Sequence, residues 1–179
     1  MEYIDVLTED GHSTGNKILR SIAHSKGLWH RTVHVWMRNR GGELLLQRRS
    51  LNKETFPGLW DISAAGHICA GDSSKEAAVR EMQEEVGVSC DSEALRFLFT
   101  LKQSYKSPNG LIEDNEIIDV YLCLTPVEED ELTLDPKEVM GAAFYSIPEI
   151  KKLISEKSAL LVPHDEEYAR LFEALAALA

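Results

Sequence analysis

A predicted helix with a clear start and a clear stop constrains this chain more than any other feature. Ser73, followed by Glu76 three residues later, fits a capping box, and Gly87 is a typical helix end. The residues between these signals are strongly helical in composition. The sequence therefore predicts a helix over residues 73–86, and the fold must provide a surface for it to pack on.

Three carboxylates share one face of this predicted helix. Glu81, Glu84 and Glu85 stand at positions i, i+3 and i+4, while Met82 and Val86 offer an apolar side for burial. Repulsion between exposed carboxylates costs roughly a few tenths of a kcal/mol per pair, which a divalent cation would reverse. Hard oxygen ligands of this kind suit Mg²⁺. The pattern by itself is more typical of a solvated helix face than of a metal site, so its context decides.

The rest of the chain alternates short strands and helices. Turn signals at Asp10-Gly11 and Gly41-Gly42 predict two hairpins, and a polar loop joins a later pair of strands. A terminal helix carries an apolar face at helical spacing, which indicates core packing. The predicted strands cover residues 3–7, 13–17, 32–37, 43–47, 95–103, 116–124 and 142–145, and the other predicted helices cover residues 18–24, 148–154 and 165–178. This mixture indicates the α/β fold class.

The acidic composition excludes two classes of partner. A net charge of −11 repels the phosphate backbone of nucleic acid and anionic lipid headgroups, so we expect contact with neither nucleic acid nor a membrane. We also expect neither export nor membrane insertion, because residues 1–5 show no basic region before an apolar stretch and no apolar run approaches the roughly 18 residues of a membrane span. An anionic substrate would therefore need local cations from lysine, arginine or a metal.

Cysteine usage and length bound the compartment and the domain count. Cys69, Cys90 and Cys123 are odd in number and lack the C-x-x-C spacing of a zinc or redox site, so we expect a reduced, cytoplasmic protein. The 179 residues are 44% hydrophobic and contain no repeat or linker. We expect a single domain over residues 1–179.

The context of the carboxylate helix resembles a known signature. Residues 66–88 read GHICAGDSSKEAAVREMQEEVGV, which resembles the Nudix box of the Nudix hydrolases. Asp72 departs from it, because the family usually has a glutamate there; the shorter side chain affects a supporting salt bridge more than the metal site. The positions in register are Gly66, Arg80, Glu81, Met82, Glu84, Glu85, Gly87 and Val88.

The resemblance implies a fold, a reaction and a set of site residues. It implies an α/β/α sandwich with a mixed β-sheet, in which Mg²⁺, or alternatively Mn²⁺, assists hydrolysis of a small-molecule diphosphate such as a nucleoside diphosphate. A homodimer is common in the family. Arg80 would orient Glu84 or Asp72 by a salt bridge, and Glu84 and Glu116 are the candidates for the general base. The metal ligands carried over by position are Glu81, Glu84, Glu85 and the carbonyl of Gly66.

The segment before the box adds two candidate ligands for the diphosphate. Residues 48–60 look like the corresponding segment of a subgroup related to isopentenyl diphosphate isomerases, in which the counterparts of Arg49 and Lys53 contact a diphosphate. A guanidinium fork and an ammonium group suit that task. Alternatively, Arg48 and Arg49 simply end a strand in solvent. For Arg48 this alternative is nearly as good as diphosphate binding, and for Arg49 it is less good.

Five further residues resemble a separate metal site of the isomerases. They are His24, His30, His67, Asp114 and Glu116, the last two in a predicted loop. A single histidine is more often structural than a ligand, but the joint match makes a second metal site an expectation. The interval from His24 to His30 is slightly shorter here, and the acidic loop lies slightly further on.

One position separates the two chemistries. The isomerases need a cysteine immediately before the Gly-His pair, and this chain has Ala65 there; Cys69 lies beyond the pair and is not assumed to replace it. The isomerases also lack the complete Arg-Glu-x-x-Glu-Glu set, which this chain has. Both differences favour hydrolysis over isomerisation. A binding module without catalysis is a third reading, and the retained glutamates disfavour it.

Overall fold

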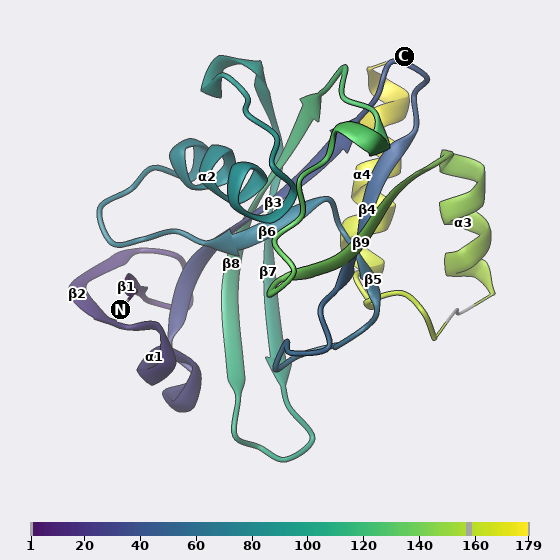
Figure 1. Cartoon of the computed structure of the whole chain (residues 1–179). Coiled ribbons are helices and arrows are strands. Elements are labelled where there is room, and N and C mark those ends of the chain that lie inside the picture. Colours follow the sequence, from purple (N-terminus) through teal and green to yellow (C-terminus); the bar gives the residue numbers. More distant parts are fainter. Residues whose placement is uncertain (1, 157–158, 179) are drawn as a thin grey trace.

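A mixed β-sheet organises the chain in the computed structural model, which describes residues 2–156 and 159–178 (Figure 1). Its central strands run in the order β5-β4-β3-β8-β7, with β6 paired to β3 and β9 paired to β4. The strands are β3 (Trp29–Arg38), β4 (Leu44–Arg49), β5 (Trp60–Asp61), β6 (Ala64–His67), β7 (Leu95–Lys106), β8 (Glu113–Leu124) and β9 (Val139–Tyr145).

Helices lie on both sides of this sheet. Helix α2 (Ser74–Val86) packs on one face, and α3 (Ile147–Ser155) and α4 (Asp165–Ala177) lie on the other (Figure 1). A separate two-stranded sheet of β1 (Tyr3–Leu7) and β2 (Ser13–Leu19) leads into α1 (Arg20–Lys26). Within the described ranges, no helix is both long enough and apolar enough to cross a membrane.

Alternation along β3 builds the two halves of the core. Val33, Val35 and Met37 point toward α2, whereas Trp36 packs with α4 residues such as Leu171 on the other face. A central strand that is buried on both faces suits a near-continuous apolar run. The layered arrangement confirms the predicted α/β/α sandwich with a mixed sheet.

The predicted second hairpin is correct only at its turn. Strands β3 and β4 pair at Arg38 and Leu44 alone, whereas β3 pairs in parallel with β8 along its whole length and in antiparallel with β6. Strand β4 instead takes β9 as its antiparallel neighbour. This parallel pairing joins residues that are 86 positions apart in the chain, and local turn signals carry no information about it.

Two other predicted boundaries are wrong. The helix predicted over residues 18–24 begins at Arg20, because Ile18 and Leu19 extend β2 and pair with Ile4 and Tyr3 of β1. The loop predicted to hold Asp114 and Glu116 is shorter, since β8 already begins at Glu113. Both acidic side chains therefore stand on a paired strand, which fixes their direction.

The start and stop of α2 are confirmed. The Ser73 hydroxyl accepts a hydrogen bond from the Glu76 amide, and the Glu76 carboxylate accepts one from the Ser73 amide. At the other end Gly87 adopts a left-handed conformation with φ 74°. A β-carbon at Gly87 would lie 2.7 Å from Thr133 Cβ and 2.8 Å from the Thr133 carbonyl oxygen. The stop is therefore fixed by packing as well as by backbone conformation.

Gly87→Ala is expected to destabilise the protein more than a matched glycine substitution does. Gly15→Ala is the control, because Gly15 has a similar φ of 78° but open space around it. The backbone strain common to both changes costs about 1–2 kcal/mol, and overlap with Thr133 adds roughly 1–3 kcal/mol for Gly87→Ala. Urea unfolding measures both variants. Equal losses would contradict the proposed packing of Thr133 on the helix end.

Candidate functional site

Helix α2 presents its carboxylates because its other side is anchored in the core. Met82 and Val86 are fully buried against the sheet, which fixes the rotation of the helix. That rotation buries the carboxylates of Glu81 and Glu85 and leaves Glu84 with 58% of its side chain exposed. Two of the three predicted metal ligands are therefore held inside the protein, and the third faces solvent at the edge of the cavity.

Gly66 of β6 lies directly under the Glu81 carboxylate. A β-carbon at Gly66 would overlap the carboxylate carbon and both oxygens of Glu81. Only glycine leaves room for this approach. The structure thus brings the residue of the predicted carbonyl ligand, on β6, next to the first predicted carboxylate ligand of the helix.

Glu85 is positioned by two donors. Its Oε2 atom accepts hydrogen bonds from the Gln47 side-chain amide at 2.8 Å and from the Ala65 backbone amide at 3.1 Å. Gln47 was not predicted as a site residue, because one glutamine in an apolar strand gives no recognisable signal. Its bond leaves the Oε1 atom of Glu85 unengaged by these donors.

Among the described residues, the three predicted carboxylate ligands of α2 outnumber the one cation bonded to them, Arg80, which pairs with Glu81 and Glu84. Burial raises the pKa of Glu81 to about 7, although Arg80 opposes the shift, and burial with repulsion from Glu81 raises the pKa of Glu85 to about 8. Crowded, desolvated carboxylate oxygens are stabilised by a hard divalent cation. The donor set at Glu81, Glu84, Glu85 and Gly66 therefore fits Mg²⁺.

Arg80 ties the helix to the loop beside it. Its Nη1 atom donates to Glu81 Oε1 at 2.7 Å and to Glu84 Oε2 at 3.3 Å, and its Nη2 atom donates to the His67 carbonyl at 2.8 Å. The sequence prediction offered Glu84 or Asp72 as its partner. The structure has the pair with Glu84, adds Glu81, and gives Asp72 no bond to Arg80 among the described residues.

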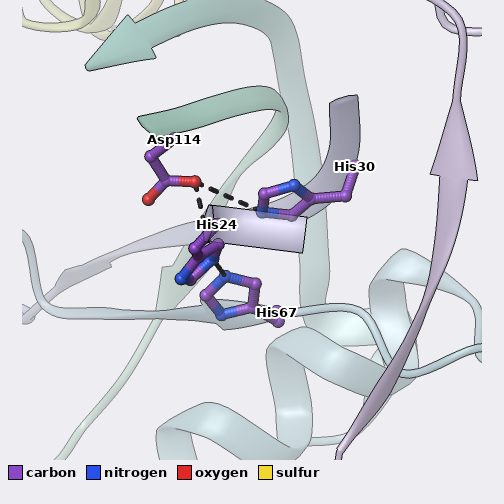
Figure 2. Close-up of side chains that lie close together, drawn as sticks. All are labelled: His24, His30, His67 and Asp114. Atoms are coloured by element: carbon purple, nitrogen blue, oxygen red, sulfur yellow. Dashed lines mark hydrogen bonds and ion pairs between the residues drawn. The ribbon is translucent and has the colours of Figure 1, made fainter. Parts of the chain in front are cut away.

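Four of the five residues predicted for a second metal site converge (Figure 2). Their potential ligand atoms all lie within 4.8 Å of one another, and they come from α1, β3, the end of β6 and β8. His24 Nε2 lies 3.0 Å from His67 Nε2 and 3.6 Å from Asp114 Oδ1, and His30 Nε2 lies 3.4 Å from the same oxygen. We call this group the histidine cluster: His24, His30, His67 and Asp114.

The chemistry of the histidine cluster fits a metal ion. Burial lowers the pKa of its three histidines, so the neutral rings keep lone pairs available. His30 Nε2 and Asp114 Oδ1 are buried and have no hydrogen-bond partner among the described residues. The fifth predicted member, Glu116, lies slightly outside, with Oε1 3.9 Å from His30 and 4.0 Å from His67.

One cavity of about 1290 Å³ joins these groups. It is larger than the roughly 300–1000 Å³ of typical small-molecule sites. The α2 carboxylates, the predicted diphosphate ligands and three members of the histidine cluster, His24, His67 and Asp114, border it. Arg49 is held there by the Thr55 carbonyl at 3.0 Å and by Asp61 at 2.9 Å, and Lys53 pairs with Glu138. Among the described residues, the Arg48 side chain bonds only the Gly58 carbonyl, as a strand end in solvent would.

Sequence reasoning missed a buried polar network at the other end of the cavity. Glu167 of α4 binds His34 Nδ1 at 2.7 Å and accepts a hydrogen bond from the Trp36 indole at 2.8 Å. Next to it, His164 Nε2 donates to Asp61 Oδ1 at 2.9 Å. Two-residue alternation could have placed His34 on the same face as His30, but nothing local indicated its partners.

Comparison with known proteins now identifies the family. The model for the NUDIX domain matches residues 28–170. Nudix hydrolase 3 of Arabidopsis thaliana is 40% identical over 177 residues, which cover 96% of this chain but only 23% of that protein. An isopentenyl-diphosphate Delta-isomerase of Pectobacterium atrosepticum is 34% identical over 145 residues, covering 81% of this chain and 77% of that one.

A solved structure agrees with these matches. The crystal structure of DR0079 from Deinococcus radiodurans superimposes with a TM-score of 0.75 and 25% identity, over 94% of this chain and 98% of that one. The family model covers the carboxylate helix, Gly66 and most of the sheet. From its sequence and its fold together, this chain belongs to the Nudix hydrolase family.

Proposed function

We propose that the protein is a Mg²⁺-dependent hydrolase that cleaves the diphosphate linkage of a nucleoside diphosphate or a related small molecule. One observation carries the proposal: the Glu81 carboxylate is buried over Gly66 and the Glu85 carboxylate is buried on the neighbouring Ala65 amide, in the cavity that Arg49 and Lys53 also line. Such a concentration of buried carboxylates needs a cation, and the cavity has room for a substrate beside it. Mn²⁺ is the alternative ion.

The residues of this chain divide the work. When bound, Mg²⁺ would neutralise phosphate charge and acidify a water molecule. Arg80 holds Glu81 and Glu84 in place, and Gln47 holds Glu85. Between the two candidate bases we favour Glu84, because it borders the cavity and is exposed enough to exchange a proton with water.

Glu116 is better placed for another task. Its side chain is 15% exposed, and burial with repulsion from Asp114 raises its pKa to about 8. It lies within 4.0 Å of two rings of the histidine cluster. We therefore assign Glu116 to a second metal site with that cluster and not to the activation of water.

Arg49 and Lys53 would contact the substrate's phosphates in different ways. Three of the five N–H donors of Arg49 are engaged by Thr55 and Asp61, so the guanidinium group is fixed and keeps two donors for a phosphate. Lys53 is paired with Glu138 at the edge of the cavity. A phosphate group would replace that carboxylate as the partner of Lys53.

An isopentenyl diphosphate isomerase is the second candidate, favoured by the histidine cluster and by the isomerase relative. Moving the double bond needs one group that donates a proton to a carbon and another group that removes a proton from a second carbon. Ala65 offers only a methyl group where the isomerases have a cysteine, and its amide is used to hold Glu85. Hydrolysis therefore remains the proposed function.

Glu84→Gln and Glu85→Gln are each expected to lower kcat by about a hundredfold or more, because each removes a negative charge needed for metal or water. Glu173→Gln is the matched control, an exposed glutamate on α4 away from the cavity. The assay follows Mg²⁺-dependent release of phosphate or nucleotide from a panel of nucleoside diphosphates, nucleotide sugars and dinucleotides. Unchanged turnover in both site variants would contradict the assignment of the helix carboxylates to the metal site.

Incubation with isopentenyl diphosphate separates the two candidate functions. We expect no dimethylallyl isomer by NMR, since no thiol occupies the position of Ala65. Detection of that isomer at a rate comparable with diphosphate hydrolysis would overturn the preference for hydrolysis.

A further inference from the structure

The sheet face under α4 changes from apolar to polar where it enters the cavity. On β3, Trp36 belongs to the core beneath α4, and His34 and Thr32 follow it on the same face. On β8, Ile118 is in that core and Glu116 follows. The uncovered part of this face therefore forms a polar floor for the cavity.

His164, at the start of α4, lines the cavity next to this polar floor. Its side chain is only 8% exposed, and it borders the cavity. The Asp61 carboxylate bridges two groups: Oδ1 accepts from His164 Nε2 and Oδ2 accepts from Arg49 Nη1, both at 2.9 Å. The Asp61 carboxylate thus links His164 to Arg49, which is proposed to bind the diphosphate.

The second ring nitrogen of His164 is buried without a partner among the described residues. Burial alone would lower the pKa of His164, but the bonded Asp61 carboxylate raises that pKa to about 9. The ring is then an imidazolium at neutral pH, and Nδ1 carries a hydrogen. Because the carboxylates of Asp61 and Glu167 together balance the charges of Arg49 and His164, the partner that this donor lacks is a neutral oxygen acceptor.

Thr32 provides a second unpartnered group on the same floor. The residue is 2% exposed, and its Oγ1 atom has no hydrogen-bond partner within the described residues. A buried hydroxyl without a partner costs free energy that valine would not cost at the same place. A threonine here is explained if the hydroxyl meets a group that enters the cavity.

We propose that His164 and Thr32 form a specificity subsite that hydrogen-bonds the hydroxyl-bearing group attached to the substrate's diphosphate. The subsite selects a sugar-bearing diphosphate over an isoprenyl diphosphate. It rests on the proposed hydrolase function, and it adds residues that the carboxylate helix does not include. The hydroxyls of a sugar can accept from His164 Nδ1 and can pair with Thr32 Oγ1. An alkyl chain in the same place would leave both groups unpaired.

Two pairs of variants isolate the two groups. Thr32→Val removes the hydroxyl and keeps the shape, and Thr32→Ser restores the hydroxyl. His164→Gln keeps a donor where Nε2 meets Asp61 and loses the Nδ1 donor, whereas His164→Asn keeps a donor near the position of Nδ1. Thermal unfolding of each variant accompanies the kinetics. A purely structural Thr32 predicts changed stability with unchanged substrate preference.

The probes are ADP-ribose, UDP-glucose and geranyl diphosphate, each assayed with Mg²⁺ for kcat and KM. We expect Thr32→Val and His164→Gln to lower kcat/KM for the two sugar-bearing probes about tenfold or more. For geranyl diphosphate, kcat/KM should stay the same or rise. Thr32→Ser and His164→Asn should recover part of the loss. Thr32→Val should be at least as stable as the wild type.

Equal effects on all three probes, or no effect of Thr32→Val on any, would overturn the subsite. That result leaves the hydrolase function standing if Mg²⁺-dependent cleavage persists in the wild type and is lost in Glu85→Gln. If the wild type cleaves no diphosphate, the hydrolase function fails instead. Calorimetric binding of ADP-ribose and geranyl diphosphate to the same variants then decides the subsite separately.

Discussion

Burial of a helix carboxylate against a glycine is the constraint on which the rest of this site depends. Glu81 occupies the space that a side chain at position 66 would fill, so the helix approaches β6 closely enough to share a ligand set with its backbone. Met82 and Val86 fix the rotation that makes this possible. Arg80 and Gln47 then fix the carboxylates themselves.

The sheet connects this carboxylate site to everything else in the cavity. One face of β3 carries His30 into the histidine cluster, Thr32 and His34 along the cavity floor, and Trp36 into the core beneath α4. The strand is held by β8 in parallel and by β6 in antiparallel pairing, so these side chains keep fixed positions. Glu167 fastens the floor to α4 by bonding His34 and Trp36.

The sequence predicted those features that depend on residues close together in the chain. The capping box at Ser73, the stop at Gly87 and the glutamate spacing were all readable, because they act within a few residues along one helix. The partnership of β3 with β8 was not readable, and neither was the bond from Gln47 to Glu85, since both depend on chain closure over long separations. His164 reaches Asp61 across 103 residues, and no pattern in either segment indicates that contact.

Direct measurement of Mg²⁺ binding, without substrate, tests the central claim that Gly66 makes room for a carboxylate cation site. Calorimetric titration would compare the wild type with Gly66→Ala and with Gly141→Ala, a strand glycine whose added β-carbon meets only an ordinary contact at 3.9 Å from Arg48. The account predicts that the wild type and Gly141→Ala bind alike, and that Gly66→Ala binds about tenfold more weakly or not at all, because its β-carbon displaces Glu81. Equal Mg²⁺ affinity in all three proteins would contradict it.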